Sequence, residues 1–274
     1  MKIAGAVMLL GACILFGFGW TGTMRKRITL LEKLCGVIRR MEPDLRQQNK
    51  PLAEIMELEG FAKIYIGALA RELAPFGLTV ETMLKPFWAA TKAMMANTSG
   101  KLNADVFWET FSAMTGVDRA QVEPICDAFY NEGFQAARAA TMDNPLAKEA
   151  VRLAHEKADK VVLATNPLFP LAGQATRLSW LGLKPEDFDL VTCYTSDRHC
   201  KPNPAYFIDI CQRLDLDPSK CLMIGNDDRE DMHCATAVGM ECFLVTDCRL
   251  PDKENPWKGA QGTFADMVKM LKSL

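Results

Sequence analysis

The stretch "LMIGNDDREDMHCATAVGM", residues 222–240, joins a short apolar run to a dense group of acidic side chains. Four carboxylates fall within five positions: Asp227, Asp228, Glu230 and Asp231. An acidic residue in the first turn of a helix stabilises it by only about 0.3–1 kcal/mol per charge. Four acids are more than this role requires. Several carboxylates at one strand end suit a hard cation such as Mg²⁺. We therefore predict that Asp227 and Asp231 are magnesium ligands, with Asp228 as a further candidate.

Four continuous apolar runs predict a parallel sheet in the second half of the chain. They are "VVLAT" at 161–165, "LVTCY" at 190–194, "CLMIG" at 221–225 and "CFLVT" at 242–246. Unbroken apolar runs of this length are typical of strands that are covered by helices on both faces. The fold class is therefore α/β with a Rossmann-like parallel sheet. In such sheets the ligand crevice lies past the carboxyl ends of the strands.

Polar residues at two of these strand ends are suited to binding an anion. Thr165 and Asn166 follow the first run, where a hydroxyl and free backbone N–H groups would face an anionic oxygen. Lys201 lies in "SDRHCKPNPAYF", residues 196–207, and a lysine held at a strand–helix junction can neutralise a phosphate or pair with carboxylates. Taken singly, Asn166-Pro167 could simply start a helix and Lys201 could be a solvated loop residue.

Residues 60–160 show helical periodicity that is interrupted at Pro75-Phe76-Gly77, Thr98-Ser99-Gly100, Thr115-Gly116 and Asn144-Pro145. The block is rich in aromatic residues, and aromatic residues at helical spacing are more often a bundle core than a cofactor site. We predict four or five helices here.

The overall composition excludes some classes of function. A net charge of -2 gives no indication of nucleic-acid binding, and ten cysteines without a CxxC pair read as reduced thiols in a cytosolic setting. Only three histidines are available, so chemistry that rests on a histidine base is poorly supplied.

The N-terminal segment predicts a membrane anchor. Residues 3–20, "IAGAVMLLGACILFGFGW", carry no charge and are near the lower length limit for a membrane-spanning helix. Lys2 precedes them and "RKR" at 25–27 follows, which places the bulk of the chain in the cytoplasm. A cleaved signal peptide and a buried element of a soluble, cytoplasmic protein are the alternatives. An amphipathic helical arm is expected to follow, ending at Pro43.

The strand-end motifs "VVLATNP", "HCKPNPAYF" and "MIGNDDREDMHCATAVGM" resemble, in this order, motifs two to four of the haloacid dehalogenase (HAD) superfamily of phosphohydrolases. The resemblance covers about residues 57–255. It implies a core with an inserted helical cap and a small phosphorylated substrate. Thr165 and Asn166 would bind the phosphoryl group, Lys201 would steady it and the nucleophile, and Asp227 and Asp231 would hold Mg²⁺.

The resemblance lacks the first motif of the family, a strand ending in Asp-x-Asp-Gly-Thr that supplies the nucleophile. The nearest match is "CILFGFGWT", residues 13–21, where glycines replace both aspartates. Asp187-Phe188-Asp189 and Asp215-Leu216-Asp217 should lie at the opposite end of the sheet. Because the missing strand belongs in the middle of the sheet, either Ile3 to Leu10 or Cys13 to Phe18 would have to fill its place, which excludes the membrane anchor.

Residues 1–58, with "RKRITLLEKL" and "PLAEIMEL", also resemble the start of small stage III sporulation membrane proteins. We therefore expect an anchor at 1–22, an arm at 23–58, a cap at 59–143 and a HAD-like core at 144–274. The first hypothesis is a magnesium-binding phosphohydrolase-like protein with negligible turnover, a pseudoenzyme. The alternatives are a membrane-tethered scaffold or binding module, and a chimeric or mis-joined chain. The sequence identifies neither the substrate nor the oligomeric state.

Overall fold

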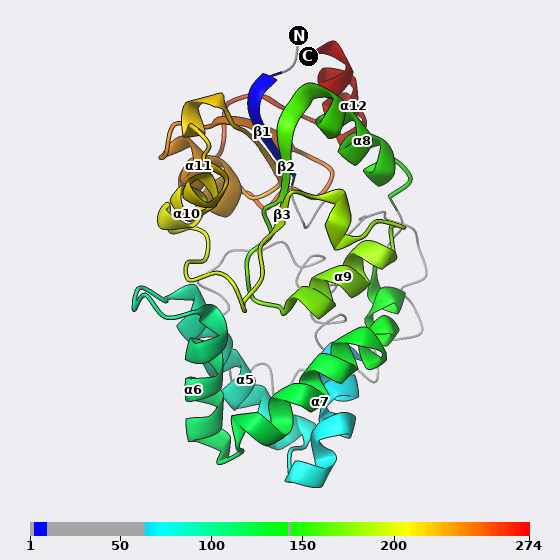
Figure 1. Ribbon diagram of the computed structural model, residues 1–274, viewed down its shortest axis with the longest axis vertical. Coiled ribbons are helices and arrows are strands. Elements are labelled where there is room, and N and C mark those ends of the chain that lie inside the picture. The colour runs from blue at the N-terminus through cyan, green and yellow to red at the C-terminus, as the bar shows by residue number, and fades with distance from the viewer. Residues whose placement is uncertain (1–2, 10–63, 142–143) are drawn as a thin grey trace.

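A six-stranded parallel sheet organises the larger part of the molecule (Figure 1). The computed structural model describes residues 3–9, 64–141 and 144–274. The strand order is β3-β2-β1-β4-β5-β6. The strands are β1 (Ile3–Leu9), β2 (Ala158–Leu163), β3 (Leu190–Val191), β4 (Leu222–Gly225), β5 (Glu241–Val245) and β6 (Gln261–Gly262). Each of the four predicted apolar runs contains or overlaps one strand, so the predicted parallel sheet is confirmed.

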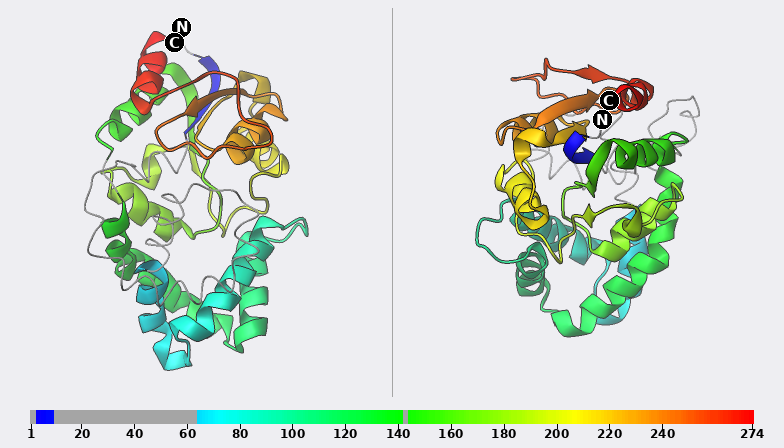
Figure 2. Two further views of the ribbon diagram at one scale, coloured as in Figure 1. Left: turned by 180° about the vertical axis from the view of Figure 1, so that it is seen from behind. Right: turned by 45° about the horizontal axis from the view of Figure 1, so that its top comes forward.

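Helices cover both faces of this sheet, as the continuous apolar strands require. Helices α8 (Ala147–Lys157) and α12 (Phe264–Ser273) lie on one side, and α10 (Ala205–Leu214) and α11 (Cys234–Thr236) lie on the other (Figures 1 and 2). The first turn of α8 follows Asn144-Pro145, where the Asn144 side chain accepts a hydrogen bond from the Leu146 N–H at 3.1 Å. A helix therefore begins within three residues of the Asn144-Pro145 interruption.

The central strand β1 is formed by the beginning of the chain. Val7 pairs with Val161 of β2 on one side and with Leu222 of β4 on the other. One of the two segments proposed to fill the central position, Ile3 to Leu10, therefore does so, and the other, Cys13 to Phe18, lies outside the described residues. The sheet is complete across its middle.

This placement corrects the prediction of a membrane anchor at residues 1–22, with membrane contact through residues 3–20. Residues 3–9 are a strand and not the first two turns of a helix. The apolar run was misread because a strand covered on both faces and a membrane helix show the same lack of charge. Within residues 64–141 and 144–274, no helix combines the length and apolar character needed to cross a bilayer. Residues 10–22 and the predicted arm at 23–58 lie outside the described part of the chain.

A second, helical unit forms the cap. It comprises a helix at 64–73, the short helix η2 (Ala74–Phe76), α5 (Val80–Met95), α6 (Asn103–Thr115), α7 (Arg119–Asn131) and η3 (Gly133–Ala140). Its buried aromatic side chains pack edge-to-face and stacked, as between Phe107 and Phe111 at 5.5 Å. The interpretation of the aromatic residues as a bundle core is confirmed.

The cap faces the carboxyl ends of the parallel strands, with α9 (Leu171–Ser179) between the two units (Figure 1). Trp180, which follows α9, is buried with the cap core, whereas Leu178 is buried in the core that covers the sheet. One helix therefore contributes to both hydrophobic cores. The cap therefore lies over the strand ends, where the ligand crevice is expected.

The loop after β5 is tied to the turn after β4 through a buried carboxylate. Asp228 is fully buried and receives two hydrogen bonds from Arg249, Nε to Oδ1 at 3.0 Å and Nη2 to Oδ2 at 2.8 Å. Its Oδ2 also accepts hydrogen bonds from the backbone N–H groups of Asp252 and Trp257. Burial alone would raise the pKa of Asp228, but these hydrogen bonds and the charge of Arg249 outweigh it and lower the pKa.

We expect a proline in β1 to damage the fold far more than a proline in an edge strand. Val7→Pro removes a backbone donor from a strand that pairs on both sides, which should lower the free energy of unfolding by about 2 kcal/mol or more. Gln261→Pro in β6 is the control, since that strand pairs on one side only. Urea unfolding measures both. Equal losses would show that Ile3–Leu9 is not a central strand.

The second expectation concerns pH. Because the folded pKa of Asp228 lies below its unfolded value of about 3.9, its contribution is complete above that value and is lost as the pH falls through the folded pKa. Asp228→Asn should cost about 2 kcal/mol at pH 7 and much less at pH 2. The exposed pair Lys101–Glu109 provides the control, since Glu109→Gln should cost under about 1 kcal/mol. A difference that persists unchanged at pH 2 would show that the charge of Asp228 is not its source.

Candidate active site

A buried ion pair lies at the carboxyl edge of the sheet. Lys201 Nζ is 2.5 Å from Asp231 Oδ1, and the two side chains are 3% and 1% exposed. The ammonium group also donates a hydrogen bond to the carbonyl oxygen of Ala164, just past β2, at 3.1 Å. It lies 5.7 Å from the centre of the Tyr206 ring. Lys201 is therefore not a solvated loop residue.

Asn166 and Lys201 hold each other in place. Asn166 Oδ1 accepts a hydrogen bond from the Lys201 N–H at 3.0 Å, and Asn166 Nδ2 donates to the Lys201 carbonyl oxygen at 3.3 Å. The same amide donates to Glu230 Oε2 at 3.0 Å. The loop after β2, the loop after β3 and the turn after β4 thus meet at this amide, as the strand-end positions predicted.

Thr165 is anchored through its backbone. Its carbonyl oxygen accepts hydrogen bonds from Thr192 Oγ1 at 2.6 Å and from the Tyr206 hydroxyl at 2.9 Å. Among the described residues, none is hydrogen-bonded to the Thr165 hydroxyl. The side chain is buried at the strand end beside Asn166, which leaves a hydroxyl available to a ligand there.

The turn after β4 encloses the carboxylate of Asp231, one of the predicted magnesium ligands. Asp231 Oδ2 accepts hydrogen bonds from the N–H groups of Asn226 and Asp227, at 3.0 and 3.1 Å. A Cβ on Gly225 would lie only 2.4 Å from the Asp231 Cβ, so only glycine allows this approach. Since its other oxygen contacts Lys201, both oxygens of Asp231 are engaged.

Asp227 caps the helical turn that follows, the π-helix η6 (Asp228–His233). Its Oδ1 accepts hydrogen bonds from the N–H groups of Arg229 and Glu230, at 2.8 and 2.7 Å. No described residue donates a hydrogen bond to Oδ2. Burial and the neighbouring charge of Asp231 raise the pKa of Asp227 above its ordinary value.

The electrostatics of the site favour an additional positive charge. Burial alone would lower the pKa of Lys201, but the charges of Asp231, Glu230 and Asp227 outweigh it and raise the pKa. Among the described residues, three carboxylates lie near the Lys201 ammonium group, and burial together with the charge of Asp231 raises the pKa of Asp227. A cation bound beside Asp227 would relieve this repulsion.

The described residues offer some of the oxygen donors that a magnesium ion would require. Asp227 offers one oxygen and Glu230 lies next to Asn166, but within the described ranges no three His, Cys, Asp or Glu side chains form a complete metal cluster. Mg²⁺ commonly binds one or two protein carboxylates and completes its shell with waters and substrate phosphate. The donors present therefore fit such an ion.

The candidate ligand Asp228 does not face this site. Both of its oxygens are occupied by Arg249 and by backbone N–H groups of the loop at 249–257. Conversely, no role was predicted for Glu230, although it is one of the four clustered acids. The roles of Tyr206 and Thr192 were also missed, because a single hydroxyl in a helix or at a strand end gives no signal of its own.

The Asp-x-Asp pairs set aside as nucleophile candidates lie at the opposite edge of the sheet. Asp189 precedes the first paired residue of β3. Its Oδ2 accepts a hydrogen bond from the N–H of Val161, and its Oδ1 forms an ion pair with Lys160. Asp217 caps the short helix η5 (Pro218–Lys220), which precedes β4. Neither pair can reach Lys201.

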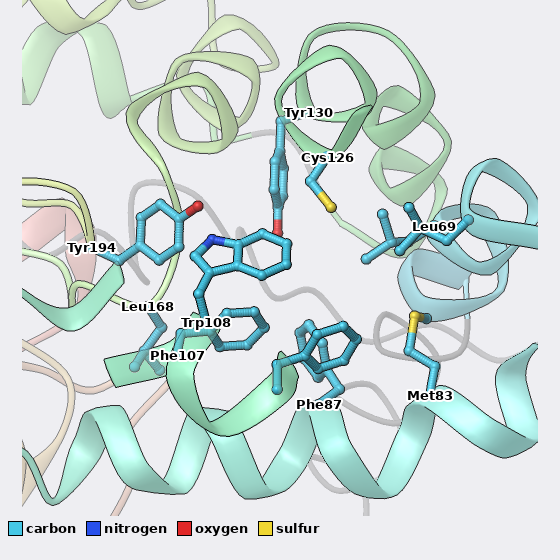
Figure 3. A pocket seen from close by; sticks show the side chains of 11 residues that line it. Leu69, Met83, Phe87, Phe107, Trp108, Cys126, Tyr130, Leu168 and Tyr194 are labelled. Carbon is cyan, nitrogen blue, oxygen red and sulfur yellow. The ribbon is translucent and has the colours of Figure 1, made fainter. Parts of the chain in front are cut away.

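A separate small cavity lies between the cap and the core loops. It has a volume of about 30 Å³, and apolar and aromatic side chains of the cap line most of it (Figure 3). The core contributes Leu168 and Tyr194, whose hydroxyl points toward the indole of Trp108 (Figure 3). This volume holds a water molecule but no larger ligand.

Several solved structures are similar to this chain. A HAD-hydrolase of Bacillus subtilis, YfnB, described as bound to magnesium, is 15% identical, with 77% of this chain and 92% of that chain covered and a TM-score of 0.50. A HAD phosphatase of Thermococcus onnurineus is 18% identical, with 80% and 91% covered and a TM-score of 0.46. The L-2-haloacid dehalogenase of Xanthobacter autotrophicus is 12% identical, with 76% and 94% covered and a TM-score of 0.47.

Among curated proteins, none matches the sequence. The family model for haloacid dehalogenase-like hydrolases matches residues 18–239, well over half of the 274 residues. The match spans the cap and the three strand ends that hold Asn166, Lys201 and Asp231. This chain belongs to the haloacid dehalogenase-like hydrolase family.

Proposed function

We propose that this protein binds a small phosphorylated molecule together with Mg²⁺ at the Lys201 site, and that it hydrolyses phosphomonoesters negligibly. The observation that carries the proposal is the buried ammonium group of Lys201, held at the carboxyl edge of a parallel sheet between Asp231 and Asn166. A buried cation at this edge, next to a free hydroxyl and an amide, favours an anionic ligand.

Each residue has a distinct role in this proposal. Lys201 provides positive charge, and the Thr165 hydroxyl and the backbone N–H of Asn166 provide hydrogen-bond donors to phosphoryl oxygens, while the Asn166 side chain fixes the backbone of Lys201. Asp231 holds Lys201 in place and keeps it protonated. Asp227 holds the metal ion through Oδ2, to which no described residue donates a hydrogen bond. Bound Mg²⁺ would offset the charge of the phosphoryl oxygens.

The low turnover follows from the sequence after the central strand. In the family that this chain resembles, the attacking aspartate follows that strand. Here β1 ends at Leu9, and residues 10–31 contain neither aspartate nor glutamate. Without a carboxylate to attack phosphorus, an aspartyl-phosphate intermediate has no site on which to form.

We expect inorganic phosphate to bind in the presence of Mg²⁺, with background hydrolysis of a generic phosphomonoester. Asn166→Ala should weaken phosphate binding about tenfold, since it removes the two hydrogen bonds that hold the backbone of Lys201 in place. Lys201→Met should weaken it more, because it removes the charge. Isothermal titration calorimetry measures binding, and circular dichroism checks that each variant is folded. Hydrolysis by the parent that Lys201→Met abolishes would show that a nucleophile is present elsewhere.

A matched pair of substitutions tests the metal site. Asp227→Asn and Asp228→Asn change the same charge at adjacent positions, but only Asp227 faces Lys201 and Asp231. Asp227→Asn should abolish measurable Mg²⁺ binding, whereas Asp228→Asn should leave the Mg²⁺ dissociation constant within about twofold. Calorimetric titration with MgCl₂ provides the measurement. Loss of Mg²⁺ binding in Asp228→Asn alone would overturn the assignment of Asp227.

A further inference from the structure

We infer that Asn103, in the cap, is a positioning residue that sets the relative placement of the two loops carrying Asn166 and Lys201. This inference rests on the proposed function, because it concerns the same phosphate site. Asn103 is the first residue of α6 and is fully buried. No motif of the sequence pointed to it.

The Asn103 side chain touches both site loops beside their functional residues. Its Nδ2 donates to the carbonyl oxygen of Pro167, which adjoins Asn166, and to Cys200 Sγ, which adjoins Lys201; both distances are 3.3 Å. Asn166 and Lys201 are themselves joined by two hydrogen bonds. The Asn103 amide therefore links the two loops at positions next to Asn166 and Lys201, the residues proposed to bind the phosphoryl group.

A second asparagine fixes the orientation of this amide. Asn97 Nδ2 donates to Asn103 Oδ1 at 3.0 Å and to the carbonyl oxygen of Arg198 at 2.8 Å. Since a donor occupies the oxygen side of the Asn103 amide, its NH₂ group must face the core. Asn97 is 5% exposed, so water does not compete freely for these groups.

Backbone contacts seat the start of α6 on the loop that leads to Lys201. The N–H groups of Asn103 and Ala104 donate to the carbonyl oxygens of Asp197 and Tyr194, both at 2.9 Å. These N–H groups have no partner within the helix, so the core loop satisfies them. The position of the cap helix α6 therefore constrains the position of segment 194–200, immediately before Lys201.

The consequence for the site is a dependence of anion affinity on a cap residue that does not touch the anion. If the Asn103 amide is lost, Pro167 and Cys200 no longer share a donor, and the donors at Asn166 and Lys201 are less well aligned. A residue that only joins the cap to the core would change the stability of the protein and leave the affinity of the folded site unchanged.

The chain offers a matched control for such a purely structural bond. Thr176 Oγ1, in α9, donates to the carbonyl oxygen of Tyr130, in the cap helix α7, at 2.7 Å, and Thr176 is buried. Thr176→Val removes this cap-to-core hydrogen bond and keeps the side-chain shape. The Tyr130 ring packs against Phe169, a contact that Thr176→Val leaves in place, and the hydrogen bond that this variant removes does not involve Pro167 or Cys200.

The test uses the full-length chain and measures phosphate binding in MgCl₂ by calorimetry, well below the melting temperature of each variant. We expect Asn103→Leu to weaken phosphate binding about tenfold, because two hydrogen bonds that align the site are lost. Thr176→Val should leave it within about twofold. Both variants should lower the melting temperature. Cys200→Ala, which removes the acceptor beside Lys201 and keeps Asn103, should weaken binding about threefold and serves if Asn103→Leu does not fold.

The outcomes separate this inference from the proposed function. If the parent does not bind phosphate, the proposed function fails. If the parent binds and Asn103→Leu or Cys200→Ala binds equally well, the role of Asn103 is overturned. Equal weakening in Asn103→Leu and Thr176→Val would also overturn it, since the loss would then reflect a general loosening of the cap.

Discussion

The ion pair between Lys201 and Asp231 is the interaction on which the rest of the site depends. Both side chains are almost fully buried, and an isolated buried charge would cost several kcal/mol, so each requires the other. Each also fixes a segment of backbone. Lys201 binds the Ala164 carbonyl oxygen at the end of β2, and Asp231 accepts the N–H groups of the turn after β4. One ion pair therefore joins the loops that follow three different strands.

This interaction divides roles among carboxylates that look equivalent in the sequence. Asp231 is saturated by the ammonium group and two N–H groups, and Asp228 is saturated by Arg249 and the loop after β5. Asp227 retains an oxygen to which no described residue donates a hydrogen bond. The turn that carries these carboxylates is a π-helix in which the Asp231 carboxylate accepts hydrogen bonds from the N–H groups of Asn226 and Asp227. Spacing predicted the cluster; only side-chain direction distinguishes the role of each member.

The sequence predicted the sheet and the helical cap well, because both follow from local patterns of apolar residues. The strands at 158–163 and 222–225 fall within three residues of the apolar runs that predicted them. The central strand was misassigned as a membrane anchor, since its identity depends on pairing with segments more than 140 residues away. The contribution of Asn103 was invisible for the same reason: its partners Pro167 and Cys200 are distant in sequence and adjacent only after the cap has docked.

If the chain lacks an attacking carboxylate, as we propose, the placement of Lys201 also accounts for a site that keeps its form without one. If the charge of Lys201 were balanced only by a residue after the central strand, loss of that residue would leave a buried ammonium group unpaired and the strand ends would separate. Here Asp231, on the turn after β4, balances the charge, and Asn166 fixes the backbone of Lys201 independently. Binding geometry and nucleophile therefore reside on different strands. A chain of this family can therefore lose the nucleophile while the interactions that maintain the binding geometry remain in place.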